Sequence, residues 1–335
     1  MAWKPEDFVD ANSSAVVVDQ AGCTEVTQAL AQFKVLGLDG DAVCRDNFPL
    51  PNLAAHLDRA SHNIHEGTGF AIIRGLDLNN FTPEDKLIVF LGLASYIGDI
   101  RGVQDRRGTM INMGGTFLAS SWTIYQELEA TRPDIINILS KPAWPLQLSG
   151  NPPSFTLAPL LQVYRGKIIF SVDPGRLGLH PASSQHARRP SDVPELTDDQ
   201  HEALDFVSKL ATKNSYRLDA MPNDMIFVNN WSLLHARESY VDSDTIQRRH
   251  LVRLWLRNSK RAWDIPRAMK APWEAAFGPN GDGNPVYLAG SKGKQWLEIE
   301  KKYPVVPAPV YKVPRYTGGS ASFILEDDGD VNALE

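Results

Sequence analysis

The hydrophobic positions of this chain fall into short runs that indicate β-strands near both ends of its folded part. Residues 69–75 form a compact apolar run between two glycines, which is typical of a buried strand. Residues 161–170 hold two short runs around a central Arg-Gly pair, and this pattern predicts a β-hairpin. Two further strands are predicted over residues 224–230 and 250–256, where apolar residues dominate.

Helices are predicted between these strands by helical spacing and by capping residues. Thr82 is suited to cap a helix that starts at Pro83, because proline fits the first turn and the acidic residues that follow favour the positive end of the helix dipole. Thr197 and Gln200 can open another helix as a capping box. Besides the helix after Thr82, helices are expected over four segments: 53–65, 121–128, 133–139 and 197–211.

The scattered prolines and glycines favour many short elements over a helical bundle. The chain has 335 residues with 23 prolines and 24 glycines, and it contains no internal repeat or low-complexity tract. We therefore expect an α+β or mainly β fold, in which a β-rich core is flanked by helices. Since no linker divides the chain, one domain is expected over residues 51–315, after a partly helical lead-in over 1–50 and before a loose acidic tail over 316–335.

Charge and composition argue against several classes of protein. Lys and Arg number 34 against 40 Asp and Glu, which gives a net charge of -6, whereas a nucleic-acid-binding surface is basic. No apolar run approaches the roughly 20 residues of a membrane span, and the N-terminus lacks the apolar core of a secretory signal. The two cysteines, Cys23 and Cys44, cannot build a disulfide framework. We expect a soluble cytoplasmic protein without nucleic-acid or membrane partners.

The most informative stretch for chemistry is the apolar strand predicted near residue 250. Because side chains alternate between the faces of a strand, Val252, Leu254 and Leu256 form an apolar layer on one face. The other face carries arginines with hydrophobic residues between them: Arg249, Leu251, Arg253, Trp255 and Arg257. Arg249 and Arg253, about 13 Å apart by strand rise, could hold two anionic groups. Ion pairs with the chain's own acidic residues are the commoner explanation of such a pattern.

His235 is the histidine that the pattern singles out. It follows the strand predicted over 224–230 and the polar segment Asn229-Asn230-Trp231-Ser232. An imidazole in this place can bind a metal, act as a base or cap a turn, and a single histidine is more often structural. The residues alone leave these roles open.

Four segments of the chain resemble blocks of one enzyme family. Residues 69–75 are similar to its N-terminal strand, and residues 119–134 to the helix after its metal motif. Residues 224–237 and 249–256 look like its closing strands, in the family's order. The family is the taurine dioxygenase-like (TauD/TfdA, clavaminate synthase-like) group of iron(II)- and 2-oxoglutarate-dependent oxygenases, and its fungal-type members are the most similar. The resemblance covers roughly residues 53–258.

The resemblance implies a double-stranded β-helix (jelly-roll) core, with iron(II) and 2-oxoglutarate as cofactors. It makes His235 similar to the distal histidine of the family's His-X-Asp…His metal triad. Arg253 is similar to the arginine that holds the C5 carboxylate of 2-oxoglutarate, and Thr116 to a hydroxyl that helps to hold it. Arg249 would then face the substrate, which is often anionic. The implied activity is hydroxylation or desaturation of a small anionic metabolite in specialised metabolism. Whether the protein forms a homo-oligomer stays open.

The family's His-X-Asp motif is missing from its expected place. The interval from Arg101 to Ser121, where the motif normally lies, contains no histidine. The chain looks as if some tens of residues were dropped there, so we expect two metal ligands to be absent and the sheet to be shortened or incomplete. The literal His56-Leu57-Asp58 lies on a predicted helix, where side chains two positions apart do not face each other, so we do not assign it to a metal.

Three interpretations of this gap stay open. The chain can be a shortened or mis-spliced oxygenase, or a pseudoenzyme that binds small molecules without a metal. Alternatively, the triad can be rebuilt from Asp105, Asn112 or a partner chain. An unrelated hydrolase or transferase is disfavoured, because the chain lacks a Gly-X-Ser-X-Gly motif, a P-loop and a His-Glu-X-X-His motif.

Overall fold

Helices and short strands follow one another along the described parts of the chain. The computed structural model describes residues 1–8, 15–102, 117–147, 155–173, 177, 193–236 and 254–270. The helices are η1 (Pro5–Asp7), α1 (Gln20–Val35), η2 (Gly40–Ala42), α2 (Ala54–Glu66), α3 (Pro83–Ile97), α4 (Ser121–Thr131), α5 (Pro133–Ser140), α7 (Asp198–Lys213) and η3 (Arg267–Met269). The strands are β1 (Ala15–Val17), β2 (Phe70–Arg74), β3 (Ile100–Gly102), β4 (Phe117–Ser120), β5 (Trp144–Gln147), β6 (Phe155–Ala158), β7 (Leu161–Tyr164), β8 (Lys167–Phe170), β9 (Tyr216–Arg217), β10 (Met225–Val228), β11 (Leu233–Ala236) and β12 (Trp255–Arg257).

Strands that are distant in sequence pair with one another. In one three-stranded sheet, β2 lies between β1, which runs parallel to it, and β10, which runs antiparallel. In the other, β4 lies between β11 and β9, and both pairings are antiparallel. Two-stranded ladders join β3 to β12, β5 to β6 and β7 to β8. The ladders of β2, β4 and β3 therefore each connect the first half of the chain to the second.

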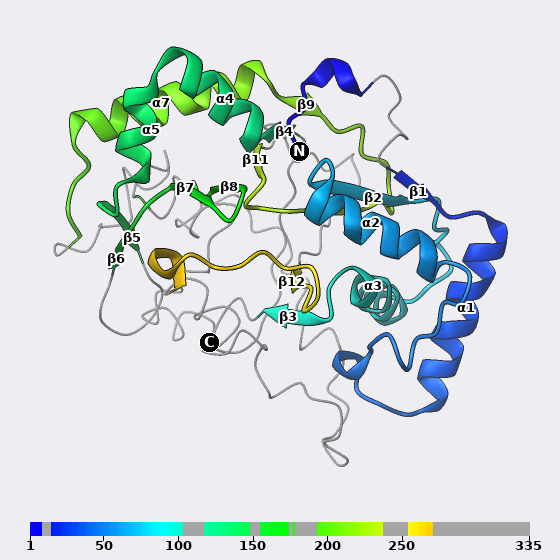
Figure 1. The fold of residues 1–335 in the computed structure, drawn as a ribbon. Coiled ribbons are helices and arrows are strands. Elements are labelled where there is room, and N and C mark those ends of the chain that lie inside the picture. Colours follow the sequence, from blue (N-terminus) through cyan, green and yellow to red (C-terminus); the bar gives the residue numbers. More distant parts are fainter. Residues whose placement is uncertain are drawn as a thin grey trace, which may run out of the picture.

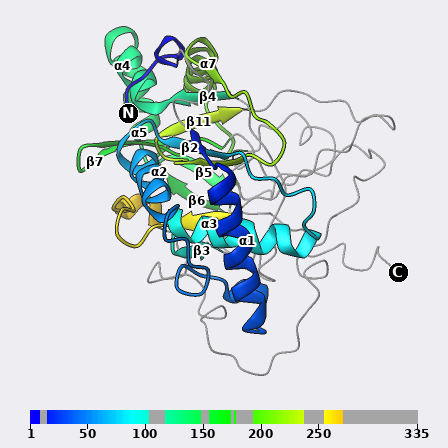
Figure 2. The same cartoon turned by 90° about the vertical axis from the view of Figure 1, so that its right-hand side faces the viewer.

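The helices gather at two ends of the molecule, and strands lie between them. Helices α1, α2 and α3 lie together at one end, and α4, α5 and α7 lie at the other (Figure 1). The view turned by a quarter shows the same separation, with α4 and α7 above and α1 and α3 below (Figure 2). The two helical groups therefore cover different parts of the strand layer.

Each helical group covers its own hydrophobic core. The first core joins α1, α2 and α3 to β2 and β10, with Phe33, Leu57, Ile73, Ile88 and Phe227 among its buried residues. The second joins α4, α5 and α7 to β5, β7 and β8, with Ile124, Ile135, Trp144, Phe170 and Val207 among its buried residues. A smaller cluster that includes Phe70 and Leu118 connects β2 to β4 between the two cores.

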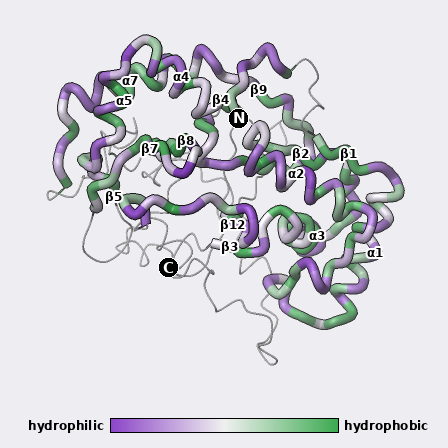
Figure 3. Tube along the Cα trace, viewed as in Figure 1, coloured by the Kyte–Doolittle hydropathy of each residue, from purple (hydrophilic) through white to green (hydrophobic). Residues whose placement is uncertain are grey.

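Helix α3 is apolar on most of its surface, as the green positions of Figure 3 show. A helix of this kind must be buried on several sides. Thr82 caps it as predicted, because its hydroxyl oxygen accepts from the backbone N–H of Asp85 at 3.1 Å. The predicted capping box of Thr197 and Gln200 is also present at the start of α7. Side-chain capping therefore places two of the major helix starts.

Most of the predicted elements are confirmed, with shifts of a few residues at their ends. The helices predicted over 53–65, 121–128 and 133–139 are α2, α4 and α5, and the predicted hairpin is β7–β8. The lead-in is more regular than expected, because it contains the 16-residue helix α1. Buried side chains of α1, such as Val26, place this lead-in within the first core.

Several short strands were not predicted. Strands β4 and β11 have four residues each and follow no clear alternation, so the hydrophobic pattern gives no signal for them. The strand predicted over 250–256 is described only from Leu254 onward, and the tail over 316–335 lies outside the described residues. Helices together with sheets nevertheless agree with the expected α+β class. In the portion of the chain that the structure covers, no helix combines the length and apolar character needed to cross a bilayer.

A buried ion pair fastens β10 to the end of β2. The Arg74 guanidinium donates to Asp224 through Nε at 3.1 Å and through Nη2 at 2.7 Å. The two side chains are only 12% and 2% exposed. The hydrogen bond to the Asp224 carboxylate raises the pKa of Arg74. The pair therefore fixes where β10 starts along β2.

Replacing Asp224 by Ala should leave a buried guanidinium without its carboxylate. We expect the free energy of unfolding to fall by about 3 kcal/mol, measured by urea denaturation. Asp264→Ala is the matched control, because Asp264 pairs with Arg165 on the surface, where both side chains are more than half exposed. That variant should stay close to the wild type. Equal losses in the two variants would contradict a special role of the buried pair.

Candidate functional site

His235 lies on β11, directly opposite Leu118 of β4. Residues that face each other across two strands share one face of the sheet, so His235 lies on the same face as Leu118 and Leu233. Those two leucines are buried in the small cluster between the two cores. The His235 side chain itself is half-buried. The imidazole is therefore held at the edge of a packed apolar layer.

A hydrogen-bonded turn delivers the chain to β11. The Asn229 carbonyl accepts from the backbone N–H groups of Ser232 at 3.0 Å and Leu233 at 3.1 Å. The Asn229 side chain accepts from Trp231 N at 3.1 Å. The Asn229 N–H donates to Gly69 O at 2.8 Å, which ties the turn to the start of β2. The turn therefore sets the position of His235 relative to both three-stranded sheets.

Gly69 lets the chain pass close to this turn. Its φ of +90° is unfavourable for residues with a Cβ. A Cβ at this position would lie 2.5 Å from Ser232 Oγ and 3.1 Å from Leu233 Cγ. The sequence marked Gly69 only as the boundary of an apolar run, so its contact with the His235 strand was missed. The Asn-Asn-Trp-Ser segment was the one signal that pointed to a turn here.

The alternation predicted for the arginine strand holds where the structure describes it. Leu254 and Leu256 pack against the first core. By strand alternation, Trp255 and Arg257 then lie on the opposite face of β12. Arg253, Arg249 and Thr116, which were predicted to bind the cofactor and the substrate, lie outside the described residues.

Arg101 of β3 lies on the face of the β3–β12 ladder that carries Leu256, and not on the face of Trp255 and Arg257. It lies opposite Leu256 in the ladder, and its guanidinium donates to the Val43 carbonyl. Burial lowers the pKa of Arg101, and the nearby carboxylate of Asp41 partly offsets this effect. We assign Arg101 a structural role at the end of η2.

The literal His56-Leu57-Asp58 motif is not a metal site. It lies on α2, and the Asp58 carboxylate accepts two hydrogen bonds from Arg261, at 2.8 and 3.0 Å. The hydrogen bonds from that guanidinium lower the pKa of Asp58. On the same helix, His65 Nδ1 lies 2.7 Å from the Ser61 carbonyl oxygen, and burial lowers its pKa. Asp58 and His65 therefore make structural contacts of α2.

Comparison with known proteins identifies the family. Residues 107–255 match the family described as taurine catabolism dioxygenase TauD, TfdA family. The taurine hydroxylase-like protein SAT17 of Stachybotrys chartarum is 30% identical over 328 residues, which take in 83% of this chain and 84% of that protein. The chain belongs to the TauD/TfdA family. The crystal structure of asparagine oxygenase matches with a TM-score of 0.51 at 16% identity, over 72% of this chain and 92% of that one.

Iron(II) and 2-oxoglutarate are the cofactors of the TauD/TfdA family. Iron in such a site needs two histidines and one carboxylate on one side of the metal. Across the described ranges, no three His, Cys, Asp or Glu side chains come together in a group that could hold a metal. His235 supplies one imidazole, and this donor set alone does not fit iron(II). Asp105 and Asn112, the other candidate ligands, lie outside the described residues.

The alignment with the SAT17 relative has more positions than this TauD/TfdA chain fills. The aligned part takes in 83% of 335 residues, or about 278, whereas the alignment is 328 positions long. About 50 of those positions therefore have no residue in this chain. The relative carries segments that this chain lacks.

Replacing Gly69 by Ala should disturb the turn that leads to His235. We expect Gly69→Ala to lower the free energy of unfolding by at least about 1 kcal/mol more than Gly166→Ala does, because only the first places a methyl group against a neighbour. Gly166, in the β7–β8 turn, also has a positive φ of +75°, but nothing lies within 4 Å of its Cβ position. Urea denaturation measures both. Equal losses would mean that backbone strain alone explains the Gly69 effect.

Proposed function

We propose that this TauD/TfdA protein binds 2-oxoglutarate and oxidises a small anionic, amino-acid-like molecule by hydroxylation or desaturation. The observation that carries the proposal is the face of β12. Leu254 and Leu256 pack on the core, in agreement with the alternation predicted from the sequence, and the same alternation predicts Arg249 and Arg253 on the opposite face. Arginines on one face of an otherwise apolar strand favour anionic partners, and a dicarboxylate such as 2-oxoglutarate supplies two carboxylates.

Each predicted site residue would have its own role in this reaction. Arg253 would hold the C5 carboxylate of 2-oxoglutarate through a bidentate hydrogen bond, and Thr116 would add a hydroxyl donor. Arg249 would bind the anionic group of the substrate. His235 would be one ligand of the iron, which supplies the oxidative chemistry when it is bound. The protein's part is to orient the two anions and to exclude water.

Two comparisons support the substrate class and the architecture. The names of the relatives refer to taurine and to asparagine, which are both small molecules with an amino group and an acidic group. The described sheets, with ladders between distant parts of the chain, are in keeping with a jelly-roll core. The positions missing from the alignment with SAT17 are in keeping with a sheet that is shorter than in the relative.

A second function, binding of a dicarboxylate without oxidation, is favoured by one observation. The interval from Arg101 to Ser121 lacks a His-X-Asp motif, so two of the usual iron ligands are absent from it. A chain of this kind could keep the arginine face and lose the metal. It would then bind 2-oxoglutarate equally well with and without iron.

Arginine substitutions test the anion-binding roles. We expect Arg253→Ala to weaken 2-oxoglutarate binding by about 10- to 100-fold, since a charge-assisted hydrogen bond is worth roughly 1.5–3 kcal/mol. Arg249→Ala should leave this affinity nearly unchanged. Isothermal titration calorimetry on the full chain measures both, with Arg132→Ala as control, because Arg132 pairs with Asp134 and Glu202 on the helical surface. The reverse pattern would exchange the two roles, and no binding by the wild type would overturn the proposal.

Succinate formation from 2-oxoglutarate separates the two functions. For the oxygenase, we expect succinate to form only when iron(II) is added, and at least about tenfold more slowly in His235→Ala, because an iron ligand is lost. His201→Ala is the matched control, since His201 is an exposed histidine of α7. Binding without succinate, and with equal affinity in chelator and in iron(II), would favour the non-catalytic function.

A further inference from the structure

Asn258, the first residue after β12, uses every hydrogen-bonding position of its side-chain amide. Its Nδ2 donates to the Ile97 carbonyl at 2.8 Å and to Ser61 Oγ at 3.1 Å. Its Oδ1 accepts from the backbone N–H groups of Lys260 and Arg261, both at 3.0 Å. An asparagine amide has two donors and two acceptor positions, so none is left over. Such complete use fixes both the position and the orientation of the amide.

Only a short ladder holds the register of the strand that precedes Asn258. The ladder between β12 and β3 has three residue pairs: Trp255 with Gly102, Leu256 with Arg101, and Arg257 with Ile100. A slip of one residue would turn every side chain of β12 to the other face. Leu256 would then leave the core, and the arginine face would be turned into it. Hydrogen bonds beyond the ladder would add to the packing of Leu256 against the first core in selecting the register.

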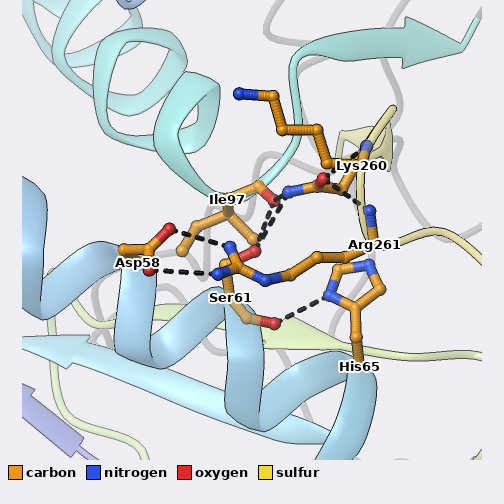
Figure 4. Close-up of polar contacts among 7 residues, drawn as sticks. Asp58, Ser61, His65, Ile97, Lys260 and Arg261 are labelled. Carbon is orange, nitrogen blue, oxygen red and sulfur yellow. Dashed lines mark hydrogen bonds and ion pairs between the residues drawn. The ribbon is translucent and has the colours of Figure 1, made fainter.

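The end of α3 provides that reference point. Ile97 is the last residue of α3, and the chain passes through Gly98 and Asp99 directly into β3. Asn258 therefore binds the same short segment that begins the partner strand. Ser61 of α2, which is fully buried, donates to the same Ile97 carbonyl at 2.9 Å. Figure 4 shows Ser61 and Ile97 beside each other at this junction. A slip of β12 would break both hydrogen bonds that Asn258 donates.

Gly98 closes the same junction from the other side. A Cβ on Gly98 would lie 3.0 Å from the Arg257 carbonyl oxygen and 3.0 Å from Leu256 Cβ. β12 therefore packs directly against the backbone of Gly98, with no space for a side chain at this position. Close approach and the Asn258 hydrogen bonds together allow one alignment of β12 on β3.

We infer that Asn258 is a positioning residue that fixes the register of β12 and thereby the face on which the strand presents its arginines. This inference rests on the proposed function for its link to 2-oxoglutarate, because Arg253 lies on the strand predicted over 250–256, five positions before Asn258. Asn258 acts on the ligand only through the strand.

The neighbouring ion pair offers a matched control. Arg261 lies in the same loop and binds Asp58, as the paired dashed lines of Figure 4 show. Its side chain is 30% exposed and that of Asp58 is 49% exposed. An exposed pair of this kind adds little to stability and does not touch the ladder. Arg261→Ala therefore changes the loop without changing the register.

Hydrogen exchange tests the register without any ligand. We expect Asn258→Ala to raise the exchange rates of the backbone amides of β3 and β12 by at least about tenfold, because the ladder loses its anchor. Arg261→Ala should leave these rates at the wild-type level. Ser61→Ala, which removes one of the two acceptors, should give an intermediate increase and keeps the test usable if Asn258→Ala does not fold. Wild-type exchange rates in both Asn258→Ala and Ser61→Ala would overturn the inference.

A double-mutant cycle then tests the link to the arginine face. Asn258→Ala should weaken 2-oxoglutarate binding about tenfold in the wild-type background and leave it unchanged in the Arg253→Ala background. A purely structural role would weaken binding by the same factor in both backgrounds, and that result would overturn the link. If the wild type binds no 2-oxoglutarate, the proposed function fails, while the exchange experiment still decides the role of Asn258.

Discussion

Short strands in this protein depend on contacts at their ends to hold their register. The ladders that connect the two halves of the chain have only two to four residue pairs each. A ladder of that length has few backbone hydrogen bonds to hold its register, and a slip by one position inverts the faces. The Asn229 turn, the Arg74–Asp224 pair and the Asn258 amide each lie at a strand end and bind a neighbouring element. The first two anchors hold β10 and β11 in the three-stranded sheets, and the Asn258 amide holds β12 on β3.

The sequence predicted well those elements whose signals are local. Thr82 and Thr197 cap their helices as expected, because capping depends only on residues within one turn. The apolar run at 69–75 became β2 for the same reason. Strand β11 lies within residues 224–237, which resemble the family's closing strands, but the hydrophobic pattern alone did not predict it. Its place depends on Gly69 and Ser120, which are far away in the sequence. Local patterns carry no information about such long-range pairing.

The candidate site could be predicted only in part. The alternation that assigned Leu254 and Leu256 to the core agrees with the packing of β12. The role of Asn258 could not be foreseen, since its partners Ser61 and Ile97 come from helices that precede it by more than 150 residues. The family could be predicted from the order of several similar sequence segments, whereas a metal site depends on the identity of individual residues. The chain therefore belongs to a family of iron enzymes, while the assignment of His235 as an iron ligand stays a prediction.

Separate anchoring of β3 and β4 has a consequence for how this family can evolve. The segment between them begins at a strand held by β12 and ends at a strand held by β11 and β9. Both flanks pair with strands from the second half of the chain. Loop closure depends only weakly on length, at about 0.6 kcal/mol for each doubling. The length of this interval can therefore change through insertions and deletions while the paired strands on either side stay in place. Catalytic groups in such an interval can be gained or lost in the same way.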